Sequence, residues 1–326
     1  MHRRSLLAAS AASAASLALP GLASAQSWPT QPVRLVVPFA AGGPTDVPAR
    51  LIAEEMSRAL PQRVIVENRT GAGVVIGTEV VAKAAKDGST FLYSTIAHAV
   101  LRAMFARLPF DPVADLTPVA LVGVVPMVLM VNKEVPAKSL QELVALLKAN
   151  PGKFDYASSG NGAALHLAGE LFLKLGGGLK VSHVPYRGSS AAYPDVLNGT
   201  VAMIIDVAAS AVPFVQKGEL RALAISGKQR SPLMPDVPTF AEAGMPDFEA
   251  YTWHMVFAPA GTPNEIVQAM NGALNKAVAA PAVRKRLEEL TVNVVDDSTP
   301  ASAAAFLKSE MEKWEPILRE AGIKPD

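Results

Sequence analysis

The sequence contains no cysteine. Disulfide bonds, thiolate catalysis and thiolate metal sites are therefore excluded, and buried apolar surface must hold the fold together. The charges are also nearly balanced, with 30 Lys and Arg residues and 29 Asp and Glu residues. Binding to nucleic acid, which needs a basic surface, is therefore not expected. Half of the residues are apolar, which is enough to build sizeable cores.

A long apolar run that could span a membrane is missing from the chain. The N-terminal segment from Met1 to Ala25 holds a shorter one, Leu6 to Leu19, between Arg3-Arg4 and the small residues Ala23-Ser24-Ala25. This is the pattern of an export signal peptide, with cleavage after Ala25. The arginine pair fits a twin-arginine signal as well as a general secretion signal. We expect a mature protein in the periplasm, with 28 basic and 29 acidic residues.

The most informative stretch of the mature chain begins at Pro32. The β-branched run Val33 to Val37 predicts a buried strand, and Gly42-Gly43 predicts a turn bare of side chains. Thr45 or Asp46 can cap the helix that follows. Unpaired N–H groups at the start of a helix form a seat for an anion, although an ordinary strand-to-helix turn has the same pattern.

Strands and helices alternate along the rest of the chain, which predicts parallel sheets with right-handed crossovers. We expect further strands at residues 64–68, 90–94, 119–125, 127–131, 154–157, 181–184, 201–205, 220–225, 252–259 and 291–295, and a short helix at 240–243.

The length of the mature chain suggests two domains. The chain should cross between them near Gly123 to Pro126 and return at Thr252 to Pro259. We expect one domain to hold residues 26–124 and 253–326, and the other to hold 125–252. The predicted fold class is α/β, with two doubly wound domains joined by a two-crossing hinge that lets them close over a ligand.

Turns between a strand and a helix recur with the same composition of Gly, Ser, Thr and Asn. In parallel sheets such turns lie at the carboxyl ends of the strands, where ligands bind. A cleft lined by N–H and hydroxyl donors suits a small carboxylate. The five turns are Gly42-Gly43, Gly71 to Gly73, Ser94-Thr95, Ser158 to Gly162 and Gly188 to Ser190.

The sequence supports an enzymatic function less well than ligand binding. The spacing of Gly71, Gly73 and Gly77 does not match a dinucleotide fingerprint, and no histidine spacing suits a metal. Ser158, His166 and Asp206 can be drawn as a triad, which leaves a periplasmic serine hydrolase as an alternative function. The nucleophile-elbow pattern Gly-x-Ser-x-Gly is nevertheless absent around Ser158. We expect no catalytic residue, no metal and no cofactor.

Several motifs in these turns are recognisable together. They are Pro38-Phe39-Ala40-Ala41-Gly42-Gly43-Pro44-Thr45-Asp46 with Arg50, Val66-Glu67-Asn68-Arg69-Thr70-Gly71-Ala72-Gly73 with Ile76-Gly77, Asp87-Gly88-Ser89-Thr90, Ser158-Ser159-Gly160-Asn161-Gly162 with His166, His183-Val184-Pro185-Tyr186-Arg187-Gly188, and Pro235-Asp236-Val237-Pro238-Thr239 with Glu242-Ala243-Gly244. With these motifs the chain resembles the Bug-type solute receptors of the tripartite tricarboxylate transporter system, over essentially all of residues 32–326. It departs from the family pattern at Val74, where glycine is usual, at Pro48 and at Lys86.

The resemblance implies a periplasmic binding protein of the Venus-flytrap type. It also implies a small carboxylate held by backbone N–H groups of the first and fourth turns with bridging waters, membrane transporter subunits as partners, and a monomer. A ligand sensor that presents to a signalling partner is a further alternative. The ligand contacts implied by the resemblance are Phe39, Gly43, Thr45, Asp46, Ser94, Thr95, Ser158, Asn161, Gly162 and Asp206.

The polar residues of this set allow more than one role. Asp46 can accept from a ligand hydroxyl, ammonium group or water, but we favour a helix cap. Asp206 closes a predicted strand and fits a ligand contact and a helix cap equally well. Tyr186 flanks the fifth turn and joins the candidate ligand contacts, whereas Arg187 beside it is more often a solvated side chain. His166 and Tyr156 are expected to be structural.

Overall fold

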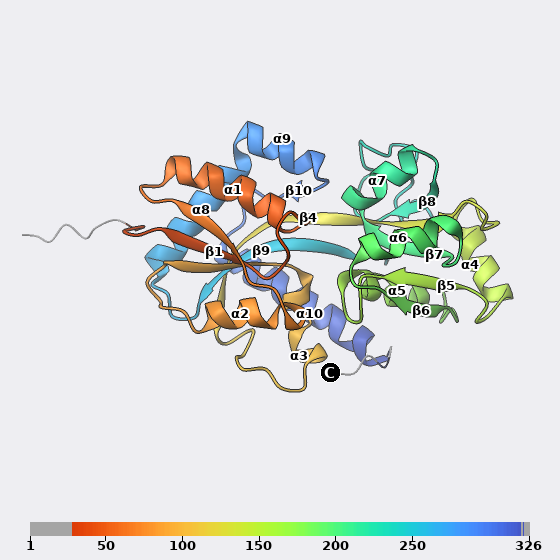
Figure 1. The fold of residues 1–326 in the computed structure, drawn as a ribbon, viewed down its shortest axis with the longest axis horizontal. Coiled ribbons are helices and arrows are strands. Elements are labelled where there is room, and N and C mark those ends of the chain that lie inside the picture. The colour runs from red at the N-terminus through yellow and green to blue at the C-terminus, as the bar shows by residue number, and fades with distance from the viewer. Residues whose placement is uncertain (1–27, 321, 323–326) are drawn as a thin grey trace, which may run out of the picture.

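The computed structural model describes residues 28–320 and residue 322, and it has two α/β lobes side by side (Figure 1). The export signal expected at residues 1–25 lies outside the described residues. No helix in the described part of the chain has the length and apolar character needed to cross a membrane.

Lobe 1 is built on the strands that come first and last in the chain. Its sheet has the order β2-β1-β3-β9-β4, and the short β10 also pairs with β4. The strands β1, β2 and β3 are mutually parallel, whereas β9 runs antiparallel to both β3 and β4. The strands are β1 Val33–Val37, β2 Val64–Asn68, β3 Thr90–Ser94, β4 Leu116–Asn132, β9 Tyr251–Pro259 and β10 Asn293–Val294.

Helices cover both faces of this sheet. In Figure 1, α1 and α9 lie on one side of it, and α2 and α3 lie on the other. They are α1 Asp46–Ala59, α2 Val75–Ala82, α3 Leu101–Met104, α8 Asn264–Ala279, α9 Pro281–Glu289 and α10 Pro300–Glu320, with short 3-10 helices η1 Ala72–Val74 and η2 Ile96–His98.

Lobe 2 continues from the far half of β4. Its sheet has the order β4-β7-β5-β6, with β8 on the other side of β4. The strands β5, β6 and β7 are parallel, and β4 is antiparallel to β7 and β8. The elements are α4 Leu140–Ala149, β5 Asp155–Ser158, α5 Ala164–Leu175, β6 Ser182–Pro185, α6 Ser189–Asn198, β7 Met203–Val207, α7 Ala208–Gln216 and β8 Leu220–Ile225.

One continuous strand, β4, joins the lobes where we expected two strands interrupted at Pro126. Residues up to Pro126 pair with β9 of lobe 1, and residues from Met127 pair with β7 and β8 of lobe 2. Proline has no N–H to give to a strand ladder, and here it falls where the partner strands change. The sheets are consequently mixed rather than wholly parallel.

Three shorter predictions also differ from the structure. The strand expected at 201–205 runs from Met203 to Val207, so Asp206 lies inside it rather than at its end. Residues 240–243 form turns instead of a helix. The last predicted strand is only two residues long, Asn293–Val294.

The C-terminal helix α10 packs against both the joining strand β4 and helix α5 of lobe 2. Its last residue, Glu320, pairs with Lys174 of α5, with 2.7 Å between Oε2 and Nζ. The lobes are thus joined by β4, by β9 and by the packing of this helix.

Candidate functional site

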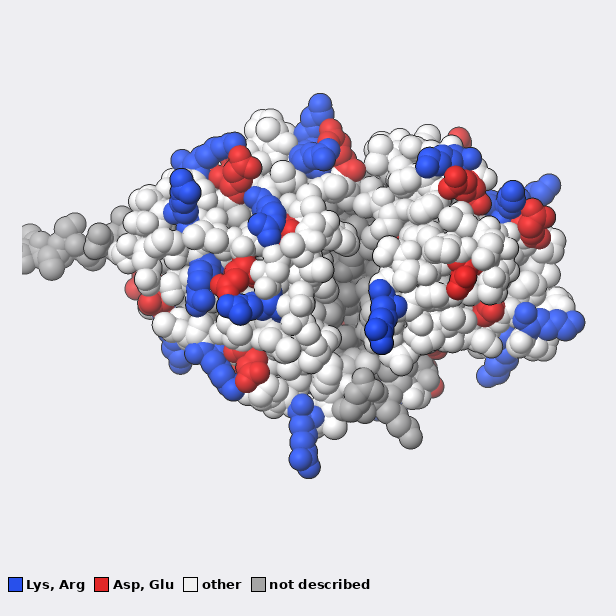
Figure 2. Space-filling model, in the orientation of Figure 1, with Lys and Arg blue, Asp and Glu red and all other residues white. Residues whose placement is uncertain are grey.

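The turns that the sequence singled out face each other across the crossing between the lobes. In lobe 1, Tyr251 of β9 pairs with Pro126 at the crossing, and Ser94 at the end of β3 pairs with Met255 nearby. In lobe 2, Val207 at the end of β7 pairs with Met127. Because β1 and β2 are parallel to β3, and β5 and β6 to β7, the carboxyl ends of all six strands point towards the crossing. Figure 2 shows a groove there between the lobes.

The first turn uses some of its amides in hydrogen bonds of its own and leaves others, within residues 28–320, without a protein acceptor. Gly42 has a φ of 76°, which favours glycine, and its N–H donates to Oδ2 of Asp46 at 2.8 Å. The N–H of Gly43 donates to the carbonyl of Ala40 at 3.3 Å. Within residues 28–320, the amides of Ala41 and Thr45 donate to no protein acceptor. The open donors of this turn are therefore neighbours of Gly43 rather than Gly43 itself.

Asp46 is completely buried and is held by protein donors. Besides Gly42, its carboxylate accepts from Arg50 Nε at 2.7 Å and from Asn68 Nδ2 at 2.8 Å. Burial raises its pKa, but the hydrogen bonds from Arg50, Gly42 and Asn68 outweigh burial and hold the pKa below its usual range. The helix cap expected of Asp46 is wrong, because Thr45 is the N-cap residue and no side chain of the described residues caps α1. Asp46 instead ties the turn to α1 and to the end of β2. The carbonyl oxygen of half-buried Phe39 accepts from the same Asn68 amide.

The second turn has a strained backbone. Ala72 and Val74 have φ values of 45° and 76°, in the left-handed region that disfavours side chains. Val74 is buried against Leu101 and Phe110 in a small apolar cluster.

The third turn carries two buried hydroxyl groups. Thr95 caps η2 by accepting from the N–H of Ala97 at 3.4 Å, and Ser94 Oγ has no hydrogen-bond partner among the residues that the structure describes. Behind this turn, His98 Nε2 lies 2.9 Å from the carbonyl oxygen of Pro112. Burial lowers the pKa of His98 to about 4, so the ring is neutral.

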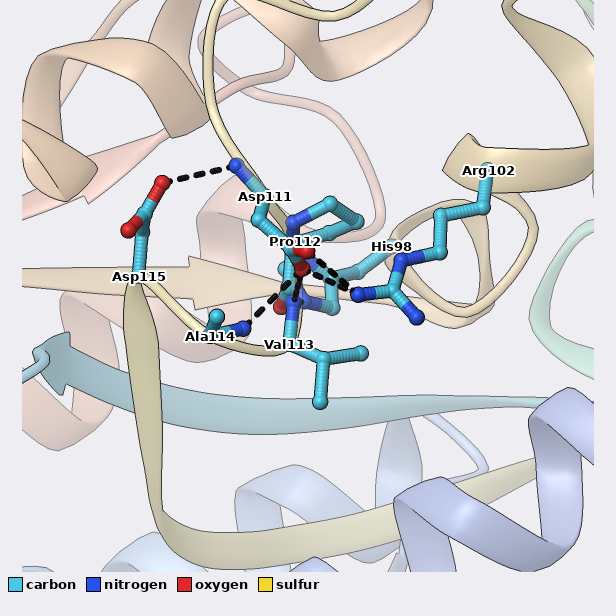
Figure 3. A network of polar contacts seen from close by, with 7 residues as sticks. All are labelled: His98, Arg102, Asp111, Pro112, Val113, Ala114 and Asp115. Carbon is cyan, nitrogen blue, oxygen red and sulfur yellow. Dashed lines mark hydrogen bonds and ion pairs between the residues drawn. The ribbon is translucent and has the colours of Figure 1, made fainter.

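The loop that holds His98 is itself fixed by Asp111 (Figure 3). The carboxylate of Asp111 accepts from Arg102 and from the N–H groups of Val113 and Ala114 at 2.8 and 3.0 Å. The hydrogen bond from Arg102, together with those two amides, lowers the pKa of Asp111 to about 2. The loop that contacts His98 behind the third turn is therefore held by the ion pair between Asp111 and Arg102.

The fourth turn lies at the start of α5 in lobe 2. Ser158 is buried and Asn161 is exposed. The N–H of Gly162 donates to Nδ1 of His166 at 2.9 Å, so this amide is occupied. In the described part of the chain, the amides of Asn161, Ala164 and Leu165 donate to no protein acceptor.

Ser158, His166 and Asp206 do not form a catalytic triad in the structure. Ser158 Oγ lies 2.6 Å from Nε2 of His183, not from His166, and Asp206 contacts other groups. Ser158 is also fully buried, so a substrate could not reach its oxygen. Among the described residues, no group of three or more His, Cys, Asp or Glu side chains is placed to hold a metal ion.

The fifth turn and β7 bring two tyrosine–aspartate pairs to lobe 2. Tyr186 donates to Asp195 at 2.6 Å, which raises the pKa of Tyr186 to about 12. Tyr193 donates to Oδ2 of Asp206 at 2.9 Å, and Oδ1 accepts from the N–H of Val207. Burial raises the pKa of Asp206 to about 6 in spite of these bonds. Asp206 caps no helix, because Val207 is the N-cap residue of α7.

The sequence analysis missed several of these partners. Arg50 follows Asp46 by four residues, which is a helical ion-pair spacing that could have been read. The partners Asn68, His183 and Tyr193 belong to other strands and helices, and no local pattern announces their contacts.

Two surface cavities lie elsewhere. One of about 540 Å³ is lined by residues of α1 and β2, including Arg50, and by Arg63 just before β2. The other, of about 530 Å³, is lined by residues between Arg102 and Pro112. Neither is lined by a residue of lobe 2, so neither is the groove between the lobes.

Comparison with known proteins identifies the family. The family described as "Tripartite tricarboxylate transporter family receptor" matches residues 48–323. The chain belongs to this family. It is 39% identical to Protein BugT of Bordetella pertussis over 303 residues, 92% of each chain. The expected resemblance to Bug-type receptors is thus confirmed.

Solved structures of the family have the same fold. An adipate-bound protein of R. palustris is 34% identical, has a TM-score of 0.80 and matches 92% of this chain and 100% of its own. MatC from Rhodopseudomonas palustris with bound malate is 35% identical, has a TM-score of 0.77 and matches 89% of this chain and 100% of its own. The predicted two-domain α/β fold of a periplasmic binding protein is confirmed, and the chain is a solute-binding receptor of this family.

Proposed function

We propose that this receptor captures a small organic carboxylate in the groove between its lobes and delivers it to the membrane subunits of a tripartite tricarboxylate-type transporter. One observation carries the proposal: the turn before α1 in lobe 1 and the turn before α5 in lobe 2 meet at the same groove. Each turn has amides that are free of protein acceptors. The positive ends of two helix dipoles then act on the same anion without a Lys or Arg.

The proposed donors differ slightly from the residues first expected. The amides of Gly43 and Gly162 are engaged within the protein, so we assign the role to the amides of Ala41 and Thr45 in lobe 1 and of Asn161, Ala164 and Leu165 in lobe 2. The buried side chains of Ser94, Thr95, Ser158 and Asp206 then shape the turns around the groove, whereas those of Phe39 and Tyr186, which are partly exposed, contact the ligand directly or through water.

Dicarboxylates are the first ligand class to examine, because solved relatives contain adipate and malate. A ligand with two anionic ends can engage the turns of both lobes at once. Contact with both lobes requires closure, so the closed shape reports that a ligand is bound. We place the hinge at the two crossings, between residues 26–124 with 253–326 and residues 125–252.

The proposal includes export and a monomeric receptor. The basic, apolar and small-residue segments of Met1 to Ala25 support removal as a signal peptide and a periplasmic location. N-terminal sequencing of the secreted protein and light scattering would examine these two points.

Binding is measured by a thermal-shift screen of organic acids that includes adipate and malate, followed by calorimetry. A ligand at 100 times its dissociation constant should stabilise the receptor by about 2.7 kcal/mol. A screen of C3 to C8 organic acids without any stabilisation would contradict the proposal.

Ala164 allows a sharper experiment, because it is the first residue of α5. Proline is tolerated at that position and has no N–H, so Ala164→Pro removes one proposed donor and keeps the helix. The preceding residue, Ala163, already has an extended conformation that suits proline. We expect at least tenfold weaker binding with little change in stability. Asn264→Pro, the same change at the exposed start of α8 and at the far end of lobe 1, should leave binding unchanged.

A further inference from the structure

Two histidines lie stacked beneath the fourth turn and each of them holds a different part of it. His166 projects from α5 and accepts the N–H of Gly162 at its Nδ1, at 2.9 Å. Because an accepting Nδ1 carries no proton, the neutral ring must carry its proton on Nε2, which faces Glu170 Oε1 at 3.7 Å. Protonation of Nδ1 would replace the acceptor by a donor and would release Gly162.

His183 holds the other end of the turn. Its Nε2 lies 2.6 Å from Ser158 Oγ, and that hydroxyl oxygen accepts the N–H of Gly160 at 3.1 Å. The chain from imidazole to hydroxyl to amide fixes the first bend of the turn. Gly160 has a φ of 126°, a conformation that favours glycine, and the hydroxyl of Ser158 fixes its N–H in this bend.

The two imidazole rings support each other. Their centroids are 3.8 Å apart with an angle of 13° between the planes, and His183 also stacks on Tyr156 at 4.9 Å. Tyr156 donates to Glu170 at 2.6 Å, which closes the cluster around the rings. Burial and the neighbouring His166 lower the pKa of His183 to about 4, so the His183 ring is neutral at pH 7.

The path of the turn also matters to the other lobe. A Cβ atom on Gly162 would lie 2.2 Å from Cε of Met104, which belongs to α3 of lobe 1. The turn is therefore pressed against lobe 1 at the residue that His166 holds. A displacement of Gly162 would disturb both the free amides of the turn and the contact between the lobes.

We propose that His166 and His183 are positioning residues for ligand capture: together they hold the fourth turn in the shape that presents the amides of Asn161, Ala164 and Leu165 to the groove. This inference rests on the proposed function, since it assigns the residues that shape one half of the proposed carboxylate seat. Neither histidine needs to touch the ligand.

Isosteric substitutions separate positioning from simple packing. His166→Phe keeps the ring stack and removes the acceptor, whereas His166→Asn places an amide oxygen where Nδ1 lies. Likewise His183→Phe removes the bond to Ser158, and His183→Gln places a polar group near the position of Nε2. His254→Phe is the matched control, because His254 is a buried, stacked histidine of lobe 1 whose ring nitrogens make no hydrogen bond with any described residue.

The first measurement is hydrogen–deuterium exchange of the peptide that spans residues 158–166, without ligand. We expect exchange at least tenfold faster in His166→Phe and His183→Phe, partial recovery in His166→Asn and His183→Gln, and no change in His254→Phe. Exchange as slow as in wild type in both Phe variants would overturn the inference, whether or not any ligand binds.

The second measurement is the dissociation constant of adipate and of malate by calorimetry for the same proteins. We expect at least tenfold weaker binding in the two Phe variants, with recovery in Asn and Gln, at equal melting temperature. Wild-type affinity in the Phe variants would overturn the inference while leaving the proposed function intact. Absence of binding by wild-type protein would count against the proposed ligand class, and the exchange measurement would still decide the role of the histidines.

Discussion

Trp253 and Trp314 donate their indole N–H groups to the same carboxylate oxygen, Oε2 of Glu310, at 3.0 and 3.1 Å. Trp253 belongs to the returning strand β9, and the other two residues belong to α10, so this contact fastens the C-terminal helix to the strand that joins the lobes. Glu310 is 2% exposed, and its other oxygen pairs with Lys313. A buried charge of this kind is tolerated because three donors satisfy it.

We predict that Glu310→Leu destabilises the protein by about 3 kcal/mol, since it leaves two buried indole N–H groups without an acceptor. Glu310→Gln keeps an acceptor oxygen and should cost about 1 kcal/mol. Urea unfolding followed by tryptophan fluorescence measures both variants. Equal stability of the two would show that the shared acceptor contributes little.

Acid should destabilise the protein through buried neutral histidines. Burial lowers the pKa of His254 to about 4, below the unfolded value of 6.5, so the unfolded chain binds a proton first as the pH falls. Stability is therefore present above pH 6.5 and is lost as the pH falls towards 4, by up to roughly 3 kcal/mol for this residue. His254→Phe should reduce the loss between pH 7 and 5 in urea unfolding. An unchanged loss would assign the acid sensitivity to other groups, such as His98 and His183 with the same direction of pKa shift.

The architecture could be predicted because local patterns and topology rules act together. The β-branched run Val33 to Val37 placed β1, the Gly-rich turns placed the starts of α1 and α5, and the rule for parallel strands brought these turns to one groove. The continuous strand through Pro126 was missed, because a proline in an apolar run predicts a break unless the partner strands are known to change there.

The candidate site was less predictable than the fold. Whether an amide is free depends on its acceptor, and the acceptors of Gly42 and Gly162 are the side chains of Asp46 and His166, each four residues further along. A carboxylate or imidazole at that spacing can equally point away. Contacts such as Tyr193 with Asp206 link different elements and follow only from the packed structure.

Two buried aspartates should respond to pH in opposite ways. The folded pKa of Asp206 is about 6, above the unfolded value of 3.8, so the folded state binds the proton more tightly and stability falls as the pH rises from 4 to 6. Asp46 has a lowered pKa, so it stabilises the protein above pH 3.8 and that contribution is lost as the pH falls below it.

We predict that Asp206→Asn gains stability relative to wild type between pH 4 and pH 7, by up to roughly 3 kcal/mol. Asp46→Asn should be less stable than wild type at pH 7, with a difference that shrinks at pH 3. Unfolding curves at both ends of each window give the comparison. The same pH trend in both variants would contradict the assigned directions.

Val74 offers a direct measure of backbone strain in the second turn. Its φ of 76° disfavours any residue with a Cβ atom, by roughly 1–2 kcal/mol. Val74→Ala removes the buried methyl groups and keeps the strain, whereas Val74→Gly removes both. We therefore predict that the glycine variant is about 1 kcal/mol more stable than the alanine variant. At exposed Ala304 inside α10, glycine should instead cost about 1 kcal/mol against alanine, and the same sign at both positions in urea unfolding would rule out strain at Val74.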